Sequence, residues 1–230
     1  MTKNAVFFDL DGTLIDSAPG IAAGLQRAFE VCEIDHDFSD FSRLIGPPIH
    51  ILLKRHFAHL DESLHQTIIK EFRNAYDEVS WKNYKEYGST RTLFENLHQL
   101  QVDTYIATNK KFGVTAKILQ ELMPGFPDER ILAPAHPFYP FSDKMEAVRN
   151  FLALKEDPWN HKIFVGDTEE DRTVATATGC TFVAAQYGYG TFDETLDFHK
   201  SSTFDSMSKT LLQLFTNAKT IQHGSYHESY

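Results

Sequence analysis

The sequence predicts an α/β fold in which a Rossmann-like, doubly wound and mostly parallel sheet carries a small all-helical cap inserted after its first strand. Short apolar runs alternate along the chain with segments of helical period, the pattern of βαβ units. Between residues 17 and 83 this alternation stops and only helical periodicity remains. We therefore expect a Rossmann-like core of residues 1–16 and 84–230 and a helical cap domain of residues 17–83.

Five apolar runs are the candidate strands of the core sheet. Strands of a parallel sheet are continuously apolar because helices cover both of its faces. The first run, residues 6–8, ends in the polar segment DLDGT, and most of the others also end at polar residues, glycine or proline. The remaining four runs are residues 104–107, 131–132, 163–165 and 182–185.

Helices are expected where apolar residues recur every three or four positions. In the core, such faces lie within residues 93–100, 114–122 and 145–152. In the cap, two longer faces run from Ile21 to Cys32 and from Leu64 to Val79, with a short helix at 51–57 after a Gly-Pro-Pro turn. The polar residues 219–230 are expected to fray at the end of the chain.

The charge balance restricts the class of partner. The chain has 22 Lys+Arg and 32 Asp+Glu, a net charge of −10, which disfavours nucleic-acid polymers and anionic membranes. No apolar stretch is long enough to span a membrane, the first residues lack a signal peptide's apolar region, and Cys32 and Cys180 do not form a disulfide framework. We expect a cytoplasmic protein, monomer or homodimer, that binds a small molecule.

Polar residues gather where the predicted strands end, and one lysine opens a predicted helix. In an open parallel sheet, ligands bind outside the carboxyl ends of the strands. A mixture of carboxylates, a hydroxyl and a lysine suits Mg²⁺ with a phosphate group, because Mg²⁺ prefers hard oxygen ligands and a phosphoryl group needs positive charge. These candidate residues are Asp9, Asp11, Thr13, Thr108, Asn109, Lys144, Asp167 and Asp171.

The segment FFDLDGTLIDS at residues 7–17 resembles the first motif of haloacid dehalogenase-like phosphohydrolases. Residues 106–110 (IATNK) resemble the second motif, Lys144 the third and residues 165–171 (VGDTEED) the fourth, in matching order and spacing over nearly the whole chain. The helical insertion resembles the small C1 cap of phosphoglycolate phosphatase-like members. Residues 43–48 (RLIGPP) resemble a cap segment of that group and of 5′-nucleotidases.

The resemblance implies a Mg²⁺-dependent phosphomonoester hydrolase that acts on a small phosphorylated metabolite through an aspartyl-phosphate. Asp9 would be the nucleophile and the Asp11 side chain the general acid–base. Mg²⁺ would be held by Asp9, Asp167 and the backbone carbonyl of Asp11.

The remaining candidates would hold the phosphate or support the site. Phosphate oxygens would be held by Thr108, Lys144 and the backbone amides near Gly12 and Asn109, and Lys144 should pair with Asp9 when no substrate is bound. Lys110 and Lys162 are alternatives to Lys144. Thr13 and Asp171 are supporting residues; Asp171 could hold a metal-bound water, orient Lys144 or act as a helix N-cap. In the cap, Arg43 is the candidate contact for substrate specificity.

Other functions remain open at this stage. A 5′-nucleotidase would use the same chemistry with a different leaving group, and a phosphosugar mutase would share the aspartyl-phosphate step. A phosphoacceptor signalling domain or a binding domain is the non-enzymatic alternative, although such domains lack a helical insertion after the first strand. Dehalogenation is disfavoured because Asp11 is present. We expect the cap to move as a lid on its two linkers.

Overall fold

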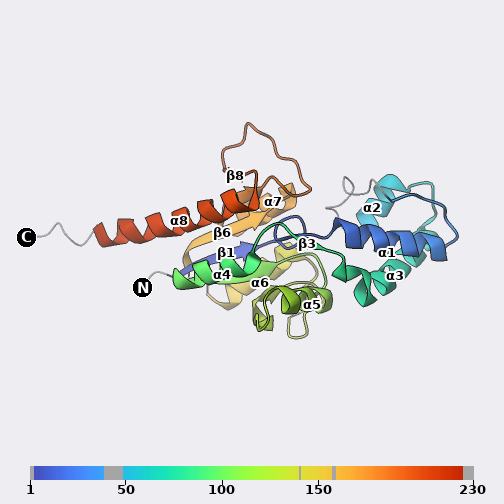
Figure 1. Cartoon of the computed structure of the whole chain (residues 1–230), viewed down its shortest axis with the longest axis horizontal. Helices are drawn as coiled ribbons and strands as arrows, with labels where there is room; N and C mark the ends of the chain where they lie inside the picture. The colour runs from blue at the N-terminus through green and yellow to red at the C-terminus, as the bar shows by residue number, and fades with distance from the viewer. Residues whose placement is uncertain (1–2, 39–48, 140, 157–158, 225–230) are drawn as a thin grey trace, which may run out of the picture. The chain divides into compact units, whose positions relative to one another are not determined.

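The computed structural model describes residues 3–38, 49–139, 141–156 and 159–224, with side chains as far as residue 217. The chain forms two compact units (Figure 1). The first consists of Met1–Leu14 and Tyr87–Tyr230, and the second of Ile15–Glu86.

The first unit is built on a six-stranded parallel sheet with strand order β5-β4-β1-β6-β7-β8. The chain adds β4 and β5 on one side of β1 and then returns to add β6, β7 and β8 on the other. This confirms the predicted fold class and places a topological switch point beside β1. The strands are β1 Lys3–Phe8, β4 Val102–Ala107, β5 Ile131–Leu132, β6 Trp159–Gly166, β7 Thr181–Ala185 and β8 His199–Ser201.

Strand register brings the polar segments to one edge of this sheet. Phe8 pairs with Ile106 of β4 on one side and with Val165 of β6 on the other. The three strands therefore end at nearly the same level, and the residues that follow each of them meet at the carboxyl edge beside β1.

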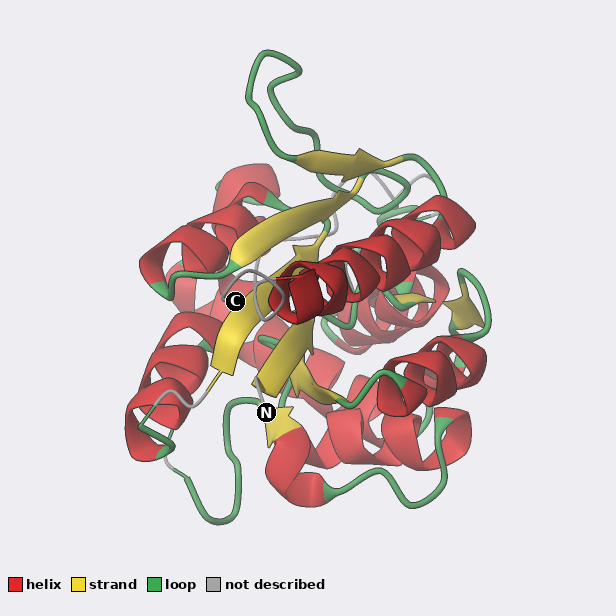
Figure 2. Ribbon diagram, turned by 90° about the vertical axis from the view of Figure 1, so that its left-hand side faces the viewer, coloured by secondary structure: helices red, strands yellow, loops and turns green. Residues whose placement is uncertain are grey.

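Helices lie on both faces of the sheet (Figure 2). Successive strand residues point to opposite faces, so Phe7 packs edge-on against Phe151 of α6 while Phe8 stacks on Phe94 of α4. The buried Phe7 face also includes Val174 of α7. The helices of this unit are α4 Thr90–Gln99, α5 Phe112–Leu122, α6 Lys144–Leu154, α7 Glu169–Ala177 and α8 Phe204–Gly224, with the short 3₁₀ helix η3 Asp128–Arg130.

The predicted elements did not include β8 or α8, and no helical face was identified for α7. Four buried residues of α8, spaced three or four positions apart, form the face that holds it on the sheet: Phe204, Met207, Leu211 and Phe215. The helix continues to Gly224, so the expectation that the chain frays from residue 219 was wrong for residues 219–224. A helix anchored by its first three turns can continue through a polar segment.

The second unit contains α1 Ala18–Val31, α2 Ile49–His56, α3 Glu62–Glu78 and the 3₁₀ helix η2 Ser80–Lys82. At its two ends, β2 Ile15–Asp16 pairs antiparallel with β3 Lys85–Glu86. The ring centroids of Phe29 in α1 and Phe57 lie 4.8 Å apart in an edge-to-face arrangement, and both rings are buried. The unit therefore has an apolar core of its own.

One expected core residue of the second unit lies at the surface. Val79 is the C-cap of α3 and is 67% exposed, so the buried face of that helix ends at Tyr76. Cys32 and Cys180 are free thiols, as expected. None of the helices in the described part of the chain has the length and apolarity needed to cross a membrane.

Candidate active site

Three buried carboxylates gather at the carboxyl edge of the sheet. Asp9 follows β1, and its backbone N–H donates to the Val165 carbonyl at 2.9 Å, which fixes it against β6. Asp167 follows β6, and Asp171 lies in the first turn of α7. Oxygen atoms of Asp9, Asp167 and Asp171 lie within 4.8 Å of one another. The core unit by itself assembles this acidic cluster.

Lys144 is the buried cation of the cluster. Its Nζ lies 2.8 Å from Asp9 Oδ1, the pairing expected for the substrate-free protein, and 2.5 Å from Asp171 Oδ1. It is the first residue of α6, and the N-cap Asp143 accepts a hydrogen bond from Glu146 N–H at 2.8 Å. The start of α6 therefore determines where this amine lies.

Asn109 connects the starts of two helices. Its Oδ1 accepts from the Lys144 backbone N–H at 2.9 Å, and its Nδ2 donates to Glu170 of α7 at 2.7 Å. Both ends of the side chain are therefore engaged, and Asn109 links the start of α6 to the start of α7. Thr108, which precedes it, is 1% exposed, and its hydroxyl accepts from the Lys110 backbone N–H at 3.2 Å.

Burial and like charge perturb the acidic groups. Burial raises the pKa of Asp9 well above its ordinary value; Lys144 opposes the rise, and Asp171 and Asp167 add to it. Burial and the neighbouring Asp171 raise the pKa of Asp167 to about 7. Burial favours the neutral Lys144 amine, but Asp171 and Asp9 outweigh it and raise the pKa of Lys144. Lys144 thus stays charged, while three carboxylates face one cation.

The turn after β1 needs a glycine next to Asp167. Gly12 has φ +86°, a left-handed conformation that side chains rarely adopt, and a Cβ there would overlap the Asp167 carboxylate. Asp11, one residue earlier, forms an ion pair with Lys110, whose Nζ lies 3.1 Å from Asp11 Oδ1. The turn therefore brings two functional candidates, Asp11 and Asp167, close to one backbone segment.

Asp171 has two roles that can be seen directly. It binds Lys144, and its Oδ2 accepts from the Thr168 backbone N–H at 3.0 Å. Thr168, rather than Asp171, is the N-cap of α7, and the two residues form a capping box. The prediction of Asp171 as an N-cap was therefore wrong: Asp171 lies inside the first turn, as the capping-box partner of the N-cap Thr168.

The acidic cluster fits a hard divalent cation. Asp167 Oδ2 accepts from the Tyr189 backbone N–H at 2.7 Å, but the buried Asp167 Oδ1 has no hydrogen-bond partner in the described structure. The hydroxyl of Thr13 is likewise buried without such a partner. A buried acceptor left unsatisfied is costly, and carboxylate oxygens are the ligands that Mg²⁺ prefers. The residues therefore suit Mg²⁺.

Three residues that contact predicted site residues were not assigned from the sequence. Lys110 was considered only as an alternative to Lys144, yet it pairs with Asp11. Tyr187 and Tyr189 follow β7. The rule that ligands bind outside the carboxyl ends of parallel strands could therefore have identified both residues. Arg43, the predicted specificity contact, lies outside the described residues.

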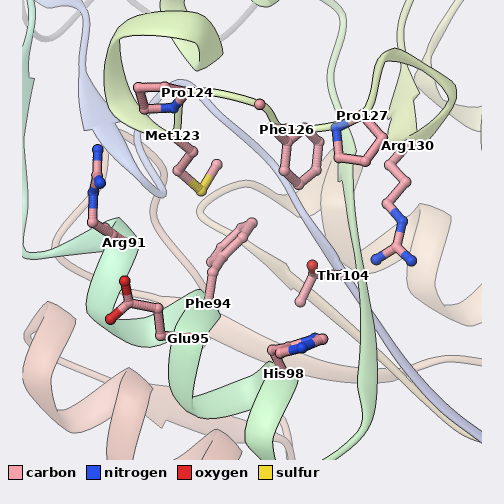
Figure 3. Close-up of a pocket in the computed structure, with 11 residues that line it drawn as sticks. Arg91, Phe94, Glu95, His98, Thr104, Met123, Pro124, Phe126, Pro127 and Arg130 are labelled. Atoms are coloured by element: carbon pink, nitrogen blue, oxygen red, sulfur yellow. The ribbon is translucent and has the colours of Figure 1, made fainter.

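A separate cavity of about 430 Å³ lies elsewhere in the core unit (Figure 3). Phe94 and His98 of α4 form one wall, Thr104 of β4 contributes to the lining, and Met123 and Phe126 lie opposite (Figure 3). None of the predicted site residues lines this cavity. Charge and strand topology, rather than hollow volume, therefore locate the candidate active site.

The fold and this site define an α/β protein with three buried carboxylates and a buried lysine at the switch point of a parallel sheet. The haloacid dehalogenase-like hydrolase family matches residues 6–185, more than half of the chain. The chain belongs to the haloacid dehalogenase-like hydrolase family.

Individual relatives agree with this assignment. The chain is 27% identical over 198 residues to a phosphoglycolate phosphatase of Xanthomonas campestris pv. campestris, covering 83% of this chain and 86% of the relative. It is 28% identical over 218 residues to the tyrosine-protein kinase PtkA of Mycobacterium tuberculosis, covering 94% and 69%. A haloacid dehalogenase-like family hydrolase from Streptococcus pneumoniae shares the fold, with a TM-score of 0.74, 22% identity and coverage of 93% of this chain and 98% of that chain.

Proposed function

We propose that the chain is a Mg²⁺-dependent phosphatase that hydrolyses the phosphomonoester of a small metabolite through an aspartyl-phosphate on Asp9. The observation that carries this proposal is the buried group of Asp9, Asp167 and Asp171 around the single amine of Lys144. Family membership and the phosphoglycolate phosphatase relatives support the same reaction class.

The reaction would divide into two displacements. An Asp9 carboxylate oxygen attacks phosphorus while the bond to the leaving oxygen breaks, and Asp11 donates its proton to the departing alkoxide. Asp11 then takes a proton from a water molecule whose oxygen attacks the phosphorus of the aspartyl-phosphate. The phosphorus–oxygen bond to Asp9 breaks, and inorganic phosphate and free Asp9 result.

The other residues stabilise charge and geometry during these steps. Lys144 holds Asp9 before substrate binds and then shares its positive charge with phosphate oxygens, which Thr108 and the backbone amides near Gly12 and Asn109 also bind. Asp9, Asp167 and the Asp11 backbone carbonyl would hold Mg²⁺. Bound there, the ion would neutralise the repulsion between a carboxylate and a phosphate.

Substrate choice is assigned to the second unit, residues 15–86, and to Arg43 as its candidate anion contact. Phosphoglycolate is the first substrate to test because curated relatives carry that name. Nucleoside 5′-monophosphates and phosphosugars test the nucleotidase and mutase alternatives. The name of the mycobacterial relatives adds a further test, transfer of the γ-phosphoryl group of ATP to a tyrosine peptide.

The deciding experiment measures phosphate release from these esters with Mg²⁺ and with EDTA. We expect Mg²⁺-dependent release from at least one ester, and Asp9→Asn should lower kcat by roughly 10³-fold or more because the amide is a poor nucleophile. The control, Asp128→Asn, makes the same change at an exposed position and should keep full activity. Full activity in Asp9→Asn, with a normal circular dichroism spectrum in both variants, would overturn the mechanism.

A further inference from the structure

The segment 187–190, sequence YGYG, follows β7 and packs directly against the acidic cluster. It contributes two hydrogen bonds to the site. The Tyr189 backbone N–H donates to Asp167 Oδ2 at 2.7 Å, and the Tyr187 hydroxyl donates to the Thr13 backbone carbonyl at 2.9 Å. One bond thus holds a candidate metal ligand, and the other holds the turn that carries Asp11 and Gly12.

The packing of this segment leaves no space for a side chain on the side of Asp167. A Cβ on Gly188 would lie 2.6 Å from Asp167 Oδ2 and would overlap the Gly12 carbonyl oxygen, and a Cβ on Gly190 would overlap the Asp167 backbone carbonyl. Since separations this short do not occur in real proteins, either substitution must displace the segment or Asp167. Both glycines are required by close approach of the backbone.

The hydrogen bonds also decide which oxygen of Asp167 is free. Oδ2 is engaged by Tyr189, whereas Oδ1 is buried without a partner in the described structure and belongs to the carboxylate that groups with Asp9 and Asp171. A hydrogen bond to the second oxygen of a ligating carboxylate fixes its orientation, and such outer partners commonly affect metal affinity strongly.

We propose that residues 187–190 position the metal site: Tyr189 N–H orients Asp167 so that Oδ1 faces a divalent cation, and the Tyr187 hydroxyl holds the Asp11–Thr13 turn in register with it. This inference rests on the proposed Mg²⁺ site and adds the residues that orient it. Tyr187 and Gly188 are therefore positioning residues, which act through Thr13 and Asp167 and do not touch substrate.

The test measures Mg²⁺ affinity of the full chain by isothermal titration calorimetry, independently of activity. Tyr187→Phe removes only the hydroxyl, and we expect the Mg²⁺ dissociation constant to rise roughly 10-fold. Gly188→Ala should raise it further, by roughly 100-fold. The matched controls are Tyr139→Phe, at a tyrosine outside the site, and Gly113→Ala, where an added Cβ meets nothing within 4 Å. Both controls should bind Mg²⁺ like the wild type.

A second measurement separates positioning from general loss of structure. At low Mg²⁺, Tyr187→Phe should show a reduced kcat that returns towards the wild-type value as Mg²⁺ is raised, with little change in KM. A ligand that binds the native state also stabilises it. Thermal unfolding in EDTA must therefore show that each variant is folded at the assay temperature, so that the rescue reports Mg²⁺ binding and not refolding.

The outcomes distinguish the inference from the proposed function. If the wild type binds Mg²⁺ and Asp167→Asn does not, while Tyr187→Phe and Gly188→Ala bind as tightly as the wild type, the positioning role is overturned and the proposed function stands. If the folded wild type binds no Mg²⁺, both are overturned.

Discussion

At the residue scale, Lys144 shows how the site balances its charge. Its amine lies between Asp9 and Asp171, and all three side chains are at most 7% exposed. Removing one partner of a buried ion pair leaves an uncompensated charge, which costs much more than the loss of a surface pair. The lysine therefore contributes to stability as well as to the phosphate binding that we propose for it.

We expect Lys144→Met to lower the free energy of unfolding by about 3–5 kcal/mol at pH 8 in EDTA. The loss should be smaller at pH 5, because protonation of the remaining carboxyl groups removes part of their repulsion. Urea unfolding followed by tryptophan fluorescence at both pH values provides the measurement. An equal loss at both pH values would contradict this electrostatic explanation.

Lys110 gives a second prediction at this scale. Its ion pair with Asp11 holds the proposed acid–base side chain, so Lys110→Met should lower kcat roughly 10-fold. The adjacent, exposed Lys111 provides the matched control, and Lys111→Met should leave kcat unchanged. Steady-state kinetics at saturating substrate compare the two. Equal activities would show that the ion pair does not contribute to the reaction.

At the scale of elements, helix starts position the charged groups. Lys144 begins α6, and Asp171 lies in the capping box of α7. The two helix starts are joined by Asn109, whose side chain contacts Lys144 and Glu170. The local features that begin these helices, a capping aspartate and a capping box, therefore also determine the geometry of the site.

The N-cap of α6 provides a prediction for this element. Asp143→Ala removes the bond to Glu146 N–H and should cost about 1 kcal/mol of stability. It should also lower kcat, because the first residue of the loosened turn is Lys144. Asp61→Ala removes the equivalent cap of α3, where Asp61 accepts from Leu64 N–H at 2.8 Å, and should cost similar stability without changing kcat. An equal loss of activity in both variants would contradict a specific effect of the α6 N-cap on Lys144.

At the scale of the whole molecule, two units share one chain. The acidic cluster lies entirely in the core unit, which is formed by Met1–Leu14 and Tyr87–Tyr230. The second unit, Ile15–Glu86, is inserted between these segments and has its own core. The residues of the acidic cluster and the inserted helices therefore come from different segments of the chain. We assign substrate choice to the inserted helices.

The stability of the whole protein should depend on pH. Burial raises the pKa of Asp9 and that of Asp167, the latter to about 7. The folded protein thus keeps protons that the unfolded chain has already released. The stabilisation that comes from protonated Asp9 and Asp167 is fully present below pH ~4, the ordinary pKa of Asp, and is lost as the pH rises towards 7.

Mg²⁺ should reverse that loss, because it binds ionised carboxylates. In EDTA, the unfolding temperature should fall between pH 5 and pH 8 by more in the wild type than in Asp167→Asn. Added Mg²⁺ should raise it more at pH 8 than at pH 5 in the wild type only. Circular dichroism melts at both pH values measure this, and a Mg²⁺ effect that is independent of pH would contradict the assignment.

Most of the fold was predictable because its signals are local. Continuous apolar runs gave five of the six sheet strands, and helical periodicity gave the helices of both units except α7 and α8. The missed strand β8 has the sequence His-Lys-Ser, which carries no apolar run. The end of α8 was placed too early, because its buried face near the start of the helix anchors a helix that continues into a polar segment. The buried face of α3 was placed too far along the chain, because it ends at Tyr76 and not at Val79.

The sequence by itself determined the fold class, the residues at the strand ends and the chemistry these residues could perform, since these follow from periodicity and residue type. The pairing of Lys144 with Asp9 was expected from the family resemblance, whereas the structure was needed to show that Lys110 pairs with Asp11 and that residues 187–190 pack against Asp167. These contacts join segments far apart in the chain, so they depend on strand order and register, which no local pattern specifies.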